Sequence, residues 1–128
     1  MKIYHFSGIE ECTSIDELSS ILDIRYDTGV NEFTMISEKN DYPYLIIMVN
    51  NEYAVLTFFQ DEEGQMFQAI GENTGLNSAE TSVFYYGAPN QETEVWNKFV
   101  VLFTKAKEAA IEFFEKLSLP TCVQWSML

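Results

Sequence analysis

The order of apolar and polar residues predicts two helices. The first stretch, "TSIDELSSILDIRYDTG", places residues of one buried helical face at Ile15, Leu18, Ile21, Leu22 and Tyr26 or Arg25. Ser14 and Glu17 have the spacing of a capping box, so we expect the helix to begin after Ser14. Gly29 stands where a C-terminal cap belongs, and we expect the helix to end there.

The second helical stretch, "TKAKEAAIEFFEKL", shows the clearest pattern in the chain. Its apolar stripe consists of Ala106, Ala109, Ala110, Phe113, Phe114 and Leu117. Most charged residues of this stretch fall outside the stripe, as expected for a helix with one buried face. Pro120 is expected to stop the helix, and "TCVQW" is typical of a last strand.

The remaining patterns predict strands. "KIYHF" opens the chain, and "NEFTMIS" alternates apolar Phe33 and Met35 with polar Glu32 and Thr34. "YPYLIIMV" and "YAVLTFF" are nearly all apolar, which favours central strands covered on both faces. A hairpin turn at residues 50–52 joins these two strands, and an acidic turn, Asp61–Gly64, leads into "QMFQAI". "SVFYY" and "VWNKFVVLF" are two further strands.

This order of elements is not a regular alternation of strands and helices. We predict an α+β fold: a largely antiparallel sheet of about six strands with two main helices packed against it. The chain shows no internal repeat and no linker, so we expect one domain over residues 1–128.

Charge changes the picture more than composition does. Twenty acidic and seven basic residues give a net charge of −13, and residues 1–97 hold seventeen of the acids and three of the bases. Such a field repels nucleic acid and anionic membranes, and it attracts a basic protein. Simple solubility is the alternative explanation. No apolar run is long enough for a membrane span and no signal peptide is evident, so we expect a cytoplasmic protein with two reduced cysteines.

Candidate chemistry is sparse. The acidic turn fails as a calcium loop because Met66 stands where the loop needs glycine. His5 is the only histidine and lacks the sequence context of a catalytic triad, and three widely spaced His and Cys residues are too few for zinc. We therefore expect no metal, no cofactor and no catalytic residue. Adjacent carboxylates such as Glu62-Glu63 leave a carboxylate-based hydrolase as a minor alternative.

Several motifs resemble a known family. They are Leu45, Val49 and Asn50 in one strand, Phe58 and Phe59 at the end of the next, the helix residues Ala106, Ala109 and Phe113, then Pro120 and Trp125. On these residues the chain resembles the first-numbered immunity-protein family of bacterial polymorphic toxin and contact-dependent inhibition systems. The resemblance covers roughly residues 15–126.

The resemblance implies a non-catalytic inhibitor that binds a cognate secreted toxin domain, either a nucleic-acid deaminase or a nuclease. It assigns no contact residues. From charge and residue type we expect partner contacts at Asp61, Glu62, Glu63, Glu72, Glu80, Tyr85, Tyr86 and Trp96. The partner is expected to be basic, with no binding to nucleic acid or membrane. A non-catalytic adaptor that binds through an exposed aromatic patch is the main alternative.

Overall fold

A computed structural model describes all 128 residues. It contains two α-helices, α1 (Ile15–Leu22) and α2 (Phe103–Lys116), and short 3₁₀ turns at Asp27–Gly29 and Asn97–Phe99. Ten strands accompany them: β1 (Lys2–His5), β2 (Gly8–Glu11), β3 (Val30–Ile36), β4 (Tyr44–Asn50), β5 (Tyr53–Phe59), β6 (Met66–Ile70), β7 (Thr81–Tyr85), β8 (Glu92–Trp96), β9 (Val101–Leu102) and β10 (Gln124–Met127).

Eight strands form one sheet. Its order is β10-β6-β5-β4-β3-β1-β2, with β9 paired to the first residues of β5, and every pair is antiparallel. The α+β class predicted from the sequence is confirmed, but the predicted number of about six strands is too small. Strand β2 (GIEE) was missed because it has no alternating apolar pattern, and the two-residue β9 was predicted only as part of a longer strand. The stretch "VWNKFVVLF" is not one strand, since a 3₁₀ turn separates β8 from β9.

Both helices pack on one face of this sheet, which we call the inner face. Leu18, Ile21 and Leu22 of α1 and the predicted alanine stripe of α2 join Phe33, Leu45 and Phe58 in the main core. The three alanines on α2, at positions 106, 109 and 110, are fully buried. Small side chains allow the helix to lie close to the strands, which explains why the stripe is rich in alanine.

The helix boundaries follow the capping signals only in part. The Ser14 hydroxyl accepts the Glu17 backbone N–H at 3.2 Å, as the capping box predicts. The predicted end at Gly29 is wrong: α1 ends at Leu22, and Gly29 closes the 3₁₀ turn before β3. Helix α2 ends at Lys116, before Pro120, because Leu117 adopts a left-handed conformation with φ of 52°.

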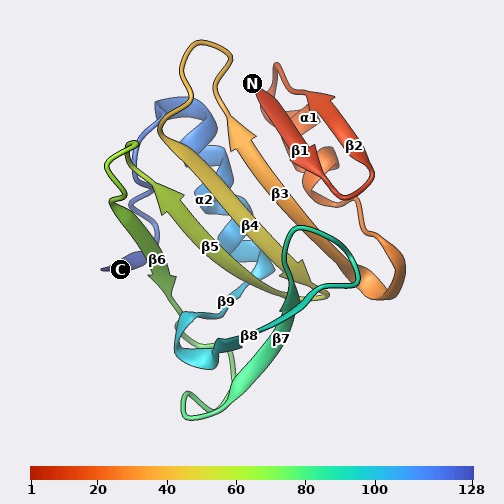
Figure 1. Cartoon of the computed structure of the whole chain (residues 1–128), viewed down its shortest axis with the longest axis vertical. Helices are drawn as coiled ribbons and strands as arrows, with labels where there is room; N and C mark the ends of the chain where they lie inside the picture. Colours follow the sequence, from red (N-terminus) through yellow and green to blue (C-terminus); the bar gives the residue numbers. More distant parts are fainter.

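The opposite, outer face carries a second layer. Strands β7 and β8 form a separate hairpin that lies in front of the lower end of the sheet, while the helices lie behind it (Figure 1). Phe84 and Val95 of the hairpin pack on Met48 and Val55 in a second, smaller core. The prediction that β4 and β5 are covered on both faces therefore holds for this half only. Neither helix combines the length and apolar character needed to span a membrane.

Candidate functional site

The outer face is left open where the hairpin does not cover it. Strand alternation directs Tyr44 of β4 and Phe59 of β5 to this face, and the register makes them direct neighbours. Their rings stack with centroids 4.4 Å apart, and the Tyr42 ring lies 5.3 Å from that of Tyr44. Burial is the main cause of a raised pKa of the Tyr44 hydroxyl, and the neighbouring Tyr42 and Tyr86 add to it. An uncovered aromatic surface of this kind is typical of a binding site.

Between the open sheet and the hairpin runs a depression of about 490 Å³, which we call the Trp96 groove. It is lined by Ile46, Met48, Thr57, Phe59, Met66, Gln68, Tyr86, Thr93, Glu94, Val95, Trp96 and Phe99. Tyr86 is 59% exposed and Trp96 is 53% exposed. Two of the three aromatic residues predicted as partner contacts thus line one apolar groove. The third, Tyr85, is half-buried opposite Glu92 and does not line it.

The loop between β7 and β8 lies in front of β3 (Figure 1). Its residue Tyr86 lines the groove, and the next three residues of the loop line a second depression. This depression, the Glu32 hollow, has a volume of about 260 Å³ and is lined by Tyr4, His5, Phe6, Glu32, Thr34, Gly87, Ala88 and Pro89. The Gly87 backbone N–H donates to Glu32 Oε1 at 3.1 Å. Glu32 Oε2 is buried and has no hydrogen-bond partner. Burial raises the pKa of Glu32, and the bond from Gly87 opposes that rise.

Sequence reasoning missed Glu32 because the alternation in "NEFTMIS" assigns it to a solvent-facing position. It does lie on the outer face, but the β7–β8 loop covers it. No local signal in the sequence shows that a loop more than fifty residues later will fold over this strand.

The predicted acidic turn lies where expected, between β5 and β6. Asp61 Oδ1 accepts the Glu63 backbone N–H at 3.0 Å, while Gly64 supplies a positive φ of 93°. Glu62 and Glu63 are exposed. Because Phe59 and Met66 flank the turn and line the Trp96 groove, the acidic turn borders one end of that groove.

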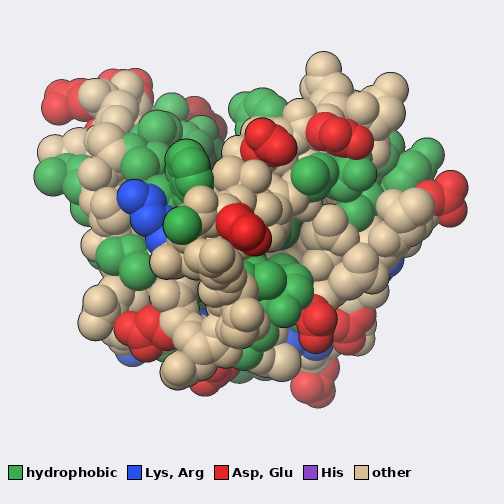
Figure 2. Space-filling view, turned by 90° about the horizontal axis from the view of Figure 1, so that it is seen from below, with side chains coloured by type: hydrophobic (Ala, Val, Ile, Leu, Met, Phe, Trp, Pro, Cys, Tyr) green, Lys and Arg blue, Asp and Glu red, His purple; other side chains and the backbone are tan.

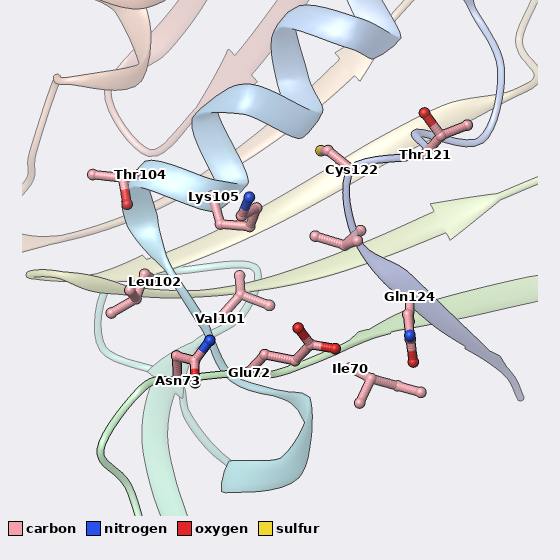
Figure 3. A pocket seen from close by; sticks show the side chains of 11 residues that line it. Ile70, Glu72, Asn73, Val101, Leu102, Thr104, Lys105, Thr121, Cys122 and Gln124 are labelled. Carbon is pink, nitrogen blue, oxygen red and sulfur yellow. The ribbon is translucent and has the colours of Figure 1, made fainter.

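The other two acidic candidates lie elsewhere. Glu72 follows β6 at the end opposite the acidic turn, and Glu80 precedes β7 with an exposed side chain. Glu72 lines a hollow of about 370 Å³ that it shares with Lys105 and Cys122 (Figure 3). Its charge contributes to a raised pKa of Lys105, whose main cause is a hydrogen bond with Glu108. The five predicted acids therefore do not form one cluster.

Charge is distributed unevenly along the chain. Residues 40–97, which include β4 to β8, hold nine of the twenty acidic residues and no lysine or arginine. On the helical side, Lys107 pairs with Asp23 at 2.8 Å, and the Arg25 guanidinium lies 4.4 Å above the Phe103 ring. Viewed from the hairpin end, acidic side chains are spread over the surface, with exposed hydrophobic side chains and a few basic side chains between them (Figure 2).

Groups that could perform catalysis are dispersed. The His5 ring packs against Phe33, and its Nδ1 accepts the Ser7 backbone N–H at 3.2 Å, which leaves the proton on Nε2 near Glu10. Burial raises the pKa of both Cys12 and Cys122, so these unpaired cysteines favour the thiol form.

No three His, Cys, Asp or Glu side chains come together as a metal site. The five main surface depressions are each lined by one acidic residue, so none of them supports the hydrolase alternative, which requires two. The neighbouring carboxyl groups of Glu11 and Glu38 share a proton more readily than isolated ones, which raises the pKa of Glu11 and lowers that of Glu38, but both side chains lie on the exposed surface.

No model of a known protein family matches the chain. The chain is similar over nearly its whole length to a protein of Burkholderia cenocepacia (strain H111) named "Double-stranded DNA deaminase immunity protein". The two are 28% identical over 123 residues, which is 96% of each chain. This similarity supports the expected resemblance to an immunity protein. It does not bear on the numbered family to which the motifs point.

Proposed function

We propose that the protein is an immunity protein that binds and neutralises a secreted deaminase toxin domain. The observation that carries this proposal is the full-length similarity to a protein named as the immunity protein of a DNA deaminase. The protein has no catalytic task in this proposal. It acts in the cytoplasm, where it covers the nucleic-acid-binding surface of the toxin and so keeps the substrate out.

Charge supports this mode of inhibition. An enzyme that acts on DNA needs a basic surface to hold phosphates. Residues 40–97, which form the hairpin and the middle of the sheet, hold nine acids and no base, so this part of the chain attracts such a surface from a distance and speeds the encounter. Nucleic acid itself is repelled by the same field.

The Trp96 groove supplies the contacts that hold the complex after the encounter. Exposed Tyr86 and Trp96 border an apolar depression, and Trp and Tyr dominate the energetically important positions of protein interfaces. The acidic turn at Asp61–Gly64 borders the groove and is the part of the predicted acidic set best placed to flank it. Glu72 and Glu80 remain predictions at a more distant edge.

The first experiment is co-expression with the toxin domain encoded beside this chain's gene, followed by affinity measurement at about 50 and 200 mM salt. Tight binding that weakens with salt, together with loss of deaminase activity, supports the proposal. A complex that forms without inhibiting the enzyme contradicts neutralisation.

A charge-reversal pair tests the acidic turn. Glu62→Lys with Glu63→Lys keeps Asp61, which holds the turn together, and is expected to slow association about tenfold and to flatten its salt dependence. The matched control reverses Glu108 and Glu115 on α2, the helix behind the sheet, and is expected to change the association rate less. Equal rates for both variants would remove the turn from the interface.

The exposed aromatic groove also fits an adaptor that binds an apolar partner. Salt dependence separates the two functions. An adaptor that binds through the groove alone shows an affinity nearly independent of salt, and it leaves deaminase activity unchanged.

A further inference from the structure

Glu32 is a half-buried carboxylate, and its atom Oε2 is buried without a cation. Its Oε2 exposes less than 1 Å² and accepts no hydrogen bond, and none of the four ion pairs in the molecule includes it. Buried carboxylates are normally paired, because an ionised oxygen that has lost its water and gained no donor destabilises the fold. Oε1 accepts the Gly87 backbone N–H, so Oε2 is the one oxygen of this carboxylate that lacks a hydrogen-bond donor.

The walls of the Glu32 hollow are suited to a flat cation. Tyr4 of β1 pairs with Thr34 of β3. Phe6 lies in the turn that follows β1, and Glu32 lies two residues before Thr34 on β3. Two aromatic side chains therefore stand beside a hydroxyl and a carboxylate on the outer face. No lysine or arginine of the chain lines the hollow.

We propose that the Glu32 hollow binds an arginine side chain of the protein partner, with the guanidinium donating to Glu32 Oε2 and packing against Tyr4. The identity of that partner rests on the proposed function. Arginine fits better than lysine because its planar group stacks on aromatic rings and donates in a fixed direction, and because it is less strongly hydrated.

Entry of the guanidinium requires a small movement of the loop tip that covers Oε2. Within the loop, the Tyr86 N–H donates to the Gln91 carbonyl and the Gln91 N–H donates to the Ala88 carbonyl. The Gly87–Glu32 bond is the hydrogen bond that ties residues 86–91 to the sheet. That bond uses Oε1, so it is kept while Ala88 and Pro89 shift and Oε2 receives the guanidinium. The arginine then supplies the charge-assisted bond that the isolated protein lacks.

A small-molecule probe tests the hollow without the toxin. Isotope-labelled protein is titrated with capped arginine, N-acetyl-arginine-N-methylamide, and backbone amide signals are followed by NMR. We expect saturable shifts at Thr34, Gly87 and Ala88. Capped citrulline has the same shape without the charge and is expected to produce less than one fifth of the shift. Glu32→Gln is expected to weaken the arginine response at least fivefold, and Glu115→Gln on α2 is the matched control that keeps it.

Shifts spread over all acidic surfaces, or an equal response in Glu32→Gln, would overturn the proposal because they indicate general charge attraction. The second arm uses the toxin domain: Glu32→Gln is expected to weaken binding about thirtyfold and Glu115→Gln less than threefold. If both variants bind the toxin as the unmodified protein does, the partner's arginine does not use the hollow. If the unmodified protein fails to bind the toxin, the proposed function is wrong, while the titration still decides whether the hollow accepts a guanidinium.

Discussion

Glu32→Gln should change how stability depends on pH. In the folded protein burial raises the pKa of Glu32, so the carboxyl group holds its proton to higher pH than it does in the unfolded chain. As pH rises from the unfolded pKa of about 4.3 through the raised folded value, the unfolded state loses its proton first. The free energy of unfolding contributed by this residue therefore falls over that interval and stays low above it.

The size of the effect follows from the surroundings of the carboxylate. Glu32 has one unsatisfied oxygen and one oxygen that accepts from Gly87, and the side chain is only partly buried. An unsatisfied buried polar group lowers the free energy of unfolding by about 1–3 kcal/mol. Because Glu32 is partly exposed, we expect its effect to lie near the lower end of this range. Between pH 4 and pH 7, we expect the free energy of unfolding of the unmodified protein to fall by about 1 kcal/mol relative to that of Glu32→Gln.

Urea unfolding at several pH values from 4 to 7.5 measures this difference. Replacing the carboxyl group by an amide also changes the free energy of unfolding by an amount that does not depend on pH. Only the pH dependence of the difference between the two proteins therefore reports on the charge of Glu32. Other titrating groups, such as Glu11 and Glu38, contribute equally to both proteins and cancel. Curves that remain parallel over the whole range would show that Glu32 is stably ionised at no energetic cost, which would refute the reasoning.

Three further variants test other parts of the structure. Trp96→Ala should weaken toxin binding by about 2 kcal/mol in a calorimetric titration and change unfolding by less than about 1 kcal/mol; an unchanged affinity would place the interface elsewhere. Gly71→Ala should destabilise by about 3 kcal/mol in urea, since the added Cβ would overlap the Val100 carbonyl oxygen. Asn31→Ala should cost about 3 kcal/mol, because its buried amide joins three backbone groups at 2.8–3.1 Å; a loss below 1 kcal/mol would contradict this.

Local patterns in the sequence were sufficient to predict most of the fold. The capping box at Ser14, the alanine stripe of α2, the alternation of β3 and the two turns after β4 and β5 all depend on neighbouring residues, and the structure confirms them. The failures involve distant contacts. Strands β2 and β9 are short and exist only because a neighbouring strand pairs with them.

The candidate site was less predictable for the same reason. Tyr44 and Phe59 belong to nearly all-apolar strands, and nothing in those strands indicates that the β7–β8 hairpin covers Met48 but leaves these two rings open. The meeting of Tyr86 and Trp96 in one groove depends on the pairing of β7 with β8. Their residue types suggested a binding role, whereas their proximity required the tertiary structure.

The loop at residues 86–91 divides the outer face into two depressions that draw on different parts of the chain. The Glu32 hollow is built on β1 and β3, whereas the Trp96 groove is built mainly on β4, β5, β6 and β8. The two depressions still touch, because Glu32 and Thr34 of the hollow pair with Met48 and Ile46 of the groove. Substitutions at these positions should be coupled in their effect on affinity, whereas the effects of substitutions at the far ends, such as Tyr4 and Trp96, should add. Under the proposed function, recognition of a new partner can therefore change at one end of the outer face while contacts at the other end preserve binding.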